Sequence, residues 1–87
     1  EWRAKYRALA DQFINSRAKD ELFCGESLRL FMQKAGIEQP SHPNAWGGAS
    51  AHVIMMWLMN DVIEHSGYST AVTPSAHKRR YPRYRVL

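Results

Sequence analysis

Basic side chains are concentrated near the end of this 87-residue chain. Five lie within the last ten positions, with no acidic residue among them: Lys78, Arg79, Arg80, Arg83 and Arg85. Such a cluster can neutralise phosphate groups, and Tyr81 beside it could pack on a sugar or a base. We predict that these residues contact the phosphate backbone of DNA. The alternative is a basic strand that is merely exposed to solvent.

Three polar side chains farther up the chain could reach base edges: Asn44, Ser50 and His52. Asparagine can pair with adenine through two hydrogen bonds, and serine can bond to any base. Capping a helix is the more typical role for Asn44, and His52 fits a surface or half-buried position equally well. We therefore keep the three as secondary candidates for base contacts.

The sequence gives no pattern for catalysis or for a metal or cofactor. The four histidines are spread along the chain with no pair three or four residues apart, and no acidic cluster accompanies them. The single Cys24 excludes an intramolecular disulfide and any multi-cysteine metal site. No phosphate-binding glycine loop is present. We predict a protein that is not an enzyme and uses no cofactor.

The hydropathy predicts a protein without membrane contact. The formal net charge is +4, and no lysine or arginine occurs between Lys34 and Lys78. The apolar run at 53–59 is too short to cross a bilayer, and no signal segment opens the chain. We expect a cytoplasmic location, which a single cysteine fits. Because the sequence starts at Glu1 without methionine, an N-terminal segment could be missing.

Residues 44–60 are predicted to form the central helix. Pro43 favours an extended conformation of the residue before it, and Asn44 is a candidate N-cap of the helix. Three- and four-residue steps place five apolar residues on one face, which we expect to face the core: Ala45, Trp46, Ala49, Val53 and Trp57.

The rest of this helix raises two questions that the sequence leaves open. Residues 53–59 are apolar on all sides, so Met55, Leu58 and Met59 need a further partner, either in this chain or in another molecule. Gly47 and Gly48 each cost a helix about 1 kcal/mol relative to alanine. They indicate either close approach by another backbone or a loosened helix start.

The remaining elements are two helices and a hairpin. Helices are predicted at 2–18 and at 25–35, with Leu22 and Phe23 as staple residues before the second and Gly36 as its stop. A hairpin follows at 62–87. Pro82 has no backbone N–H, so the last strand of this hairpin should lie at a sheet edge or be irregular near its start. The predicted core contains Phe13, Leu28, Phe31, Trp46, Val53, Trp57, Ile63 and Tyr84.

The predicted fold is mainly α with a C-terminal β-hairpin, in a single domain over residues 1–87. Three helices followed by a hairpin with the basic tip SAHKRR is the order of a winged helix-turn-helix. In that plan the third helix can enter a major groove, and the hairpin tip, the wing, lies along the DNA backbone or in the minor groove.

Several segments resemble a group of small phage and prophage proteins: HPNAWGG at 42–48, Ile63, SGY at 66–68 and PSAHKRRYPRYR at 74–85. The resemblance covers residues 22–86 and implies a winged helix with a nucleic-acid-binding or replication-associated role. It carries over nine fold or wing positions: Asn44, Ala45, Trp46, Gly47, Gly67, His77, Arg79, Pro82 and Tyr84. The chain departs from the pattern at Asp61, where a helix-ending glycine is usual. It also lacks the basic residues common on the outer face of the helix, which argues against major-groove reading.

We therefore predict a phage-type winged-helix protein that binds double-stranded DNA through its basic wing and C-terminal strand, in replication or regulation. The alternative is a protein-interaction module, either a homodimer or a binder of a host protein, that uses the Met-rich central helix. A module without DNA function should be indifferent to loss of the wing charges.

Overall fold

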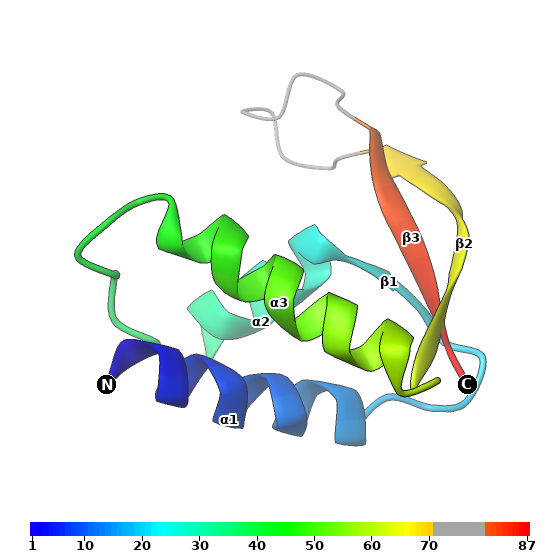
Figure 1. The fold of residues 1–87 in the computed structure, drawn as a ribbon, viewed down its shortest axis with the longest axis horizontal. Helices are drawn as coiled ribbons and strands as arrows, with labels where there is room; N and C mark the ends of the chain where they lie inside the picture. The colour runs from blue at the N-terminus through cyan, green and yellow to red at the C-terminus, as the bar shows by residue number, and fades with distance from the viewer. Residues whose placement is uncertain (71–79) are drawn as a thin grey trace.

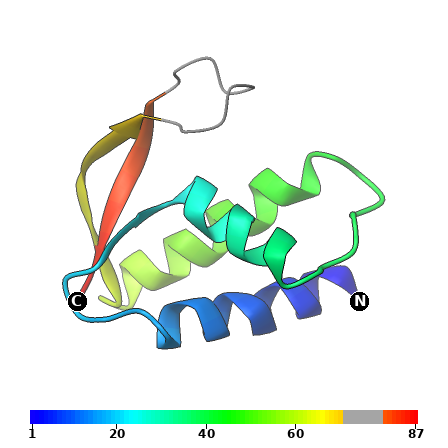
Figure 2. The same cartoon turned by 180° about the vertical axis from the view of Figure 1, so that it is seen from behind.

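The protein folds into three helices and a three-stranded antiparallel sheet (Figure 1). The computed structural model describes residues 1–70 and 80–87, with the backbone alone at Ser69, Thr70 and Arg80. The elements in chain order are α1 (Trp2–Asn15), β1 (Leu22–Cys24), α2 (Gly25–Lys34), α3 (Ala45–Met59), β2 (Ile63–Thr70) and β3 (Arg80–Val86). Viewed from behind, α2 lies in front of α3 and above α1, and β1 leads directly into it (Figure 2).

The first helix is three residues shorter than predicted and ends at Asn15. Polar side chains near its end bond to the local backbone and compete with further helix. The Ser16 hydroxyl donates to the Phe13 carbonyl at 2.8 Å, and the Glu21 carboxylate accepts from the Ala18 N–H at 3.3 Å. The predicted extension to residue 18 is therefore wrong.

Strand β1 was not predicted. Leu22 and Phe23, which the sequence suggested only as staple residues before α2, pair with β3, where Phe23 lies opposite Tyr84. The sheet order is β1-β3-β2, so the last strand lies in the centre of the sheet. The ladder with β1 ends at Arg83, and Pro82 pairs with β2 alone. The missing N–H of proline thus falls where β3 is locally an edge, in keeping with the predicted restriction.

Left-handed residues end the second and third helices. After α2, Gly36 has φ 82°, and the Ile37 N–H donates to the Met32 carbonyl at 3.2 Å, which confirms the predicted stop. After α3, Asp61 has φ 56°, and the Val62 N–H donates to the Trp57 carbonyl at 2.9 Å. Asp61 therefore has the left-handed conformation that a helix-ending glycine usually has, although this conformation is more strained for aspartate than for glycine.

The core lies where the three helices meet the inner face of the sheet. Seven of the eight predicted core residues are buried, and Phe31 is half-buried at the margin. Aromatic rings make much of the packing: Phe13 meets Phe23 edge to face at 5.2 Å between centroids, and Trp2 meets Trp46 in the same way at 5.3 Å. Along β3, Tyr84 and Val86 are buried in this core, and Arg83 and Arg85 beside them are half-buried.

Candidate nucleic-acid interface

Of the basic residues at the tip of the predicted wing, the structure describes the backbone of Arg80, at the outer end of the β2–β3 hairpin. This end projects beyond the helices (Figure 1). Arg80 begins β3 opposite Thr70. Lys78, Arg79 and the carried-over His77 lie outside the described residues. Of the five predicted phosphate contacts, the structure thus gives side-chain surroundings for Arg83 and Arg85.

The Arg83 side chain binds the backbone of β2 at a shift in the strand register of the hairpin. Its Nε donates to the Ser66 carbonyl at 2.8 Å, within the register shift between His65 and Tyr68. Gly67 forms this bulge with φ 76°, and a Cβ added there would lie 3.5 Å from the Arg83 guanidinium. Arg83 is half-buried, so part of its hydrogen-bonding capacity serves the fold and part faces solvent.

Arg85 is bound by two carboxylates. Its Nε donates to Glu64 Oε1 at 2.7 Å, Nη2 also pairs with this oxygen, and Nη1 donates to Asp20 Oδ1 at 2.8 Å. The hydrogen bond with Glu64 is the main reason that the pKa of Arg85 is raised. The guanidinium therefore links β3 to β2 and to the turn before β1, and its charge is already compensated.

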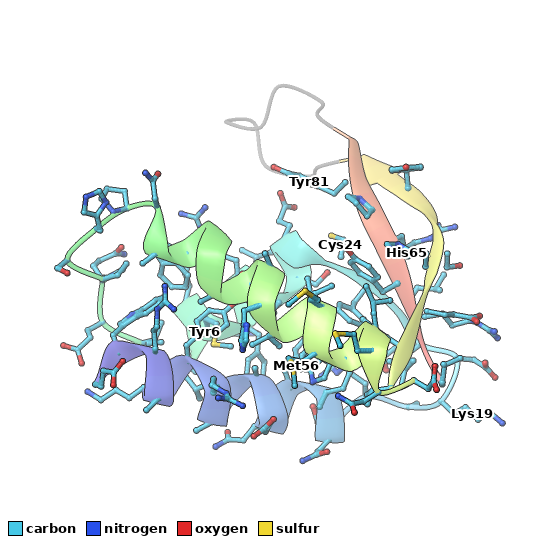
Figure 3. All side chains as sticks on the ribbon, in the orientation of Figure 1. Tyr6, Lys19, Cys24, Met56, His65 and Tyr81 are labelled. Carbon is cyan, nitrogen blue, oxygen red and sulfur yellow. The ribbon has the colours of Figure 1, made fainter. Side chains whose placement is uncertain are left out.

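Ser50 points toward α1. Its hydroxyl lies 2.5 Å from the Tyr6 hydroxyl, and Tyr6 lies between α1 and α3 (Figure 3). Burial raises the pKa of Tyr6 above its ordinary value of 10.0, and the hydrogen bond with Ser50 acts in the opposite direction. The half-buried Ser50 is thus occupied by a bond within the chain and does not face outward as a base reader would.

Asn44 and His52 are both exposed but occupy different places. Asn44 stands at the N-cap of α3 with φ −70° and ψ −11°, and its side chain makes no capping hydrogen bond. His52 turns toward α1, where it lines a groove of about 320 Å³ together with Arg3 and Arg7. The structure therefore does not bring the three candidate base readers together on one face.

Two arginines of α1 that are not among the predicted contacts also line this groove. Arg3 and Arg7 are spaced four residues apart on α1, and neither forms an ion pair within the described part of the chain. A neighbouring hollow is lined by Asp11, Met56 and Asn60 besides Arg7 and His52. Arg3, Arg7 and Asp11 follow one another at four-residue steps and so share a side of α1, but only packing shows that this side borders α3.

The outer face of α3 is apolar. We define it as Gly47, Gly48, Ala51, Met55 and Met59, all of which are exposed. Met55 is 50% exposed and Met59 is 71% exposed, so the described residues do not complete a core around them. None of the five has a polar side chain, so these residues cannot form the side-chain hydrogen bonds that direct recognition of bases uses.

Among the described residues, no backbone packs closely against the two helical glycines. A Cβ added at Gly47 would meet no atom within 4 Å, and one at Gly48 would meet only the Arg3 guanidinium at 4.0 Å. Close approach by another backbone, one of the two explanations that the sequence left open, therefore does not occur among the described residues.

Across residues 1–70 and 80–87, no group of three or more histidine, cysteine, aspartate or glutamate side chains could hold a metal ion. No helix in this part of the chain is long and apolar enough to cross a membrane. Comparison of the chain with family models, curated proteins and solved structures found no match.

Proposed function

We propose that this chain is a winged-helix DNA-binding protein that holds the duplex mainly by its phosphate backbone. The observation that carries the proposal is the connectivity. The elements follow the order α1-β1-α2-α3-β2-β3, with the sheet order β1-β3-β2 and a basic segment between the two hairpin strands. This arrangement fits a helix-turn-helix core with a wing, as the resemblance to small phage proteins also implies.

The proposed contacts are Lys78, Arg79, Arg80 and the solvent-facing part of Arg83. Arg85 is left out, because Glu64 and Asp20 already compensate its charge. Phosphate contacts position a protein on DNA without reading its sequence. Since Ser50 is bonded to Tyr6 and the outer face of α3 is apolar, we expect weak discrimination between sequences.

The proposal is tested by fluorescence-anisotropy titration of a labelled duplex at several salt concentrations. Four phosphate contacts should give a slope of log K against log salt of about −3.6. The double variant Lys78→Ala/Arg79→Ala should bind more weakly, with a slope shallower by about 1.8. The matched control is Lys19→Ala/Lys34→Ala, which lowers the formal net charge of +4 by the same two units at exposed positions elsewhere.

The proposal predicts that the control keeps the slope of the wild type. If the two variants weaken binding equally, net charge alone attracts the DNA and the wing has no special part. If the wild type does not bind at low salt, the proposal is wrong.

A second candidate function is protein interaction through the outer face of α3. The observation that favours it is the exposure of Met55 and Met59 beside two glycines that no other described backbone approaches. Methionine adapts its shape to a partner, and an exposed apolar patch of this kind is typical of interaction sites. This function does not require the wing, so loss of the wing charges would leave it intact.

A further inference from the structure

Tyr68 differs from every other Trp, Tyr and Phe side chain of the chain in its exposure. The chain has three Trp, four Tyr and three Phe, all of them within the described ranges, and all but Tyr68 are buried or half-buried. Tyr68 is 63% exposed and lies on β2, in the part of the hairpin that projects beyond the helices (Figure 1). Core packing therefore does not account for this ring.

A bulge in β2 decides which face of the hairpin carries Tyr68. The register shifts between His65 and Tyr68, and Gly67 permits the shift with φ 76°. The shift adds one residue to β2, so Tyr68 lies on the face opposite to the one that a regular ladder continued from His65 would give it. Its partner on β3 is the exposed Pro82. Because partners in a ladder share a face, the two rings stand side by side at the surface.

The chain around this face is basic. Positions 66–87 contain five lysine and arginine residues and no aspartate or glutamate. Arg80 begins β3 two residues beyond the partner of Tyr68, about 7 Å along the strand. Arg83 is half-buried at the bulge, and the nearest acidic residue along β2, Glu64, is paired with Arg85. An exposed ring in such a segment suits a ligand that combines a flat ring with negative charge, as a nucleotide does.

We propose that Tyr68 stacks on an unpaired base, so that the hairpin binds DNA where a duplex adjoins a single strand. Within a duplex each base face is covered by the next base pair, and only the base edges reach the grooves. A tyrosine ring can therefore stack on a base only where pairing has ended. Stacking accepts every base, because each has a π-face, and this agrees with weak discrimination between sequences. The inference rests on the proposed function, since the wing holds the strand beside Tyr68.

Anisotropy titration with two labelled substrates tests the stacking. One is a blunt duplex of about 20 base pairs, and the other is the same duplex with a single-stranded overhang of about ten nucleotides. The decisive variant is Tyr68→Val, which removes the ring and keeps a residue that favours strands. It should bind the overhang substrate at least about fivefold more weakly than the wild type and bind the blunt duplex equally well. The matched control is Tyr68→Phe, which keeps the ring and should bind both substrates like the wild type.

A fluorescent adenine analogue placed in the overhang reports the stacking directly, because its emission falls when a ring stacks on it. The wild type and Tyr68→Phe should lower this emission, and Tyr68→Val should not. Since Tyr68 is exposed, circular dichroism should show the same secondary structure in all three proteins. A loss of affinity with unchanged structure then belongs to the missing ring.

The proposal is wrong if Tyr68→Val weakens binding to both substrates equally or to neither. The salt slope separates that result from the outcome for the wing. Tyr68→Val removes no charge, so it should keep the wild-type slope on both substrates, whereas Lys78→Ala/Arg79→Ala should make the slope shallower. A wild type that ignores the blunt duplex but binds the overhang through Tyr68 would overturn the proposed function and support the stacking.

Discussion

The hydroxyl groups of Tyr6 and Ser50 lie 2.5 Å apart and connect α1 to α3. Ser50 belongs to a helix whose residues are otherwise almost entirely apolar, and the Tyr6 side chain is fully buried. The bond satisfies the hydroxyl of a tyrosine that is otherwise packed among apolar groups. It also fixes which side of α3 faces α1, and thereby which residues remain on the outer face.

Removing either partner of this bond should lower the stability of the fold. We expect Tyr6→Phe and Ser50→Ala each to reduce the free energy of unfolding by about 1 kcal/mol, because each leaves one hydroxyl unpaired in a partly buried place. The double variant should lose less than the sum of the two. Urea unfolding of the four proteins in this cycle measures the coupling, and strictly additive losses would show that the bond contributes nothing.

Burial should make the stability depend on alkaline pH. The pKa of Tyr6 is raised chiefly by burial, and so is the pKa of Tyr84. The unfolded chain therefore releases these protons first, so their contribution is complete below about pH 10 and is lost as the pH rises through the folded values. Urea midpoints measured from pH 8 to 11 should fall more steeply for the wild type than for Tyr6→Phe/Tyr84→Phe. Parallel curves would contradict this account.

Arg85 and Arg79 should behave differently on substitution, although the sequence places both in the basic C-terminal segment. Arg85→Ala removes the ion pairs with Glu64 and Asp20 and should lower the thermal midpoint slightly, with little change in the salt slope of DNA binding. Arg79→Ala should make the slope shallower by about 0.9 without changing stability. Calorimetry and anisotropy titration separate the two effects. An Arg85→Ala slope as shallow as that of Arg79→Ala would return Arg85 to the phosphate contacts.

Substituting alanine for Gly47 and for Gly67 should change the stability of the fold in opposite directions. Gly47 is helical with open space around its Cβ position, so Gly47→Ala should stabilise the fold by about 1 kcal/mol. Gly67 has φ 76° in the bulge of β2, so Gly67→Ala should destabilise it by about 1–2 kcal/mol. Chemical denaturation tests both variants. Equal effects would mean that the bulge relaxes to accept a side chain.

The sequence determined the helices, the hairpin and most of the core, because periodicity and turn residues are local signals. The spacing of Trp46, Val53 and Trp57 identified the buried face of α3, and Gly36 identified the end of α2. Strand β1 could not be predicted in this way. Three residues give almost no periodicity, and the strand forms only because β3 supplies its hydrogen-bond partners.

Tertiary structure decided how the functional side chains are used. In the sequence, Arg85 is one of several basic residues, and Ser50 is an available polar group. Folding brings Glu64 and Asp20 to Arg85 across the sheet and brings Tyr6 to Ser50 across the helices. Packing likewise left Met55 and Met59 uncovered, although their sequence fits a core. Such contacts depend on strand register and helix packing, which join residues far apart in the chain and therefore leave no local pattern.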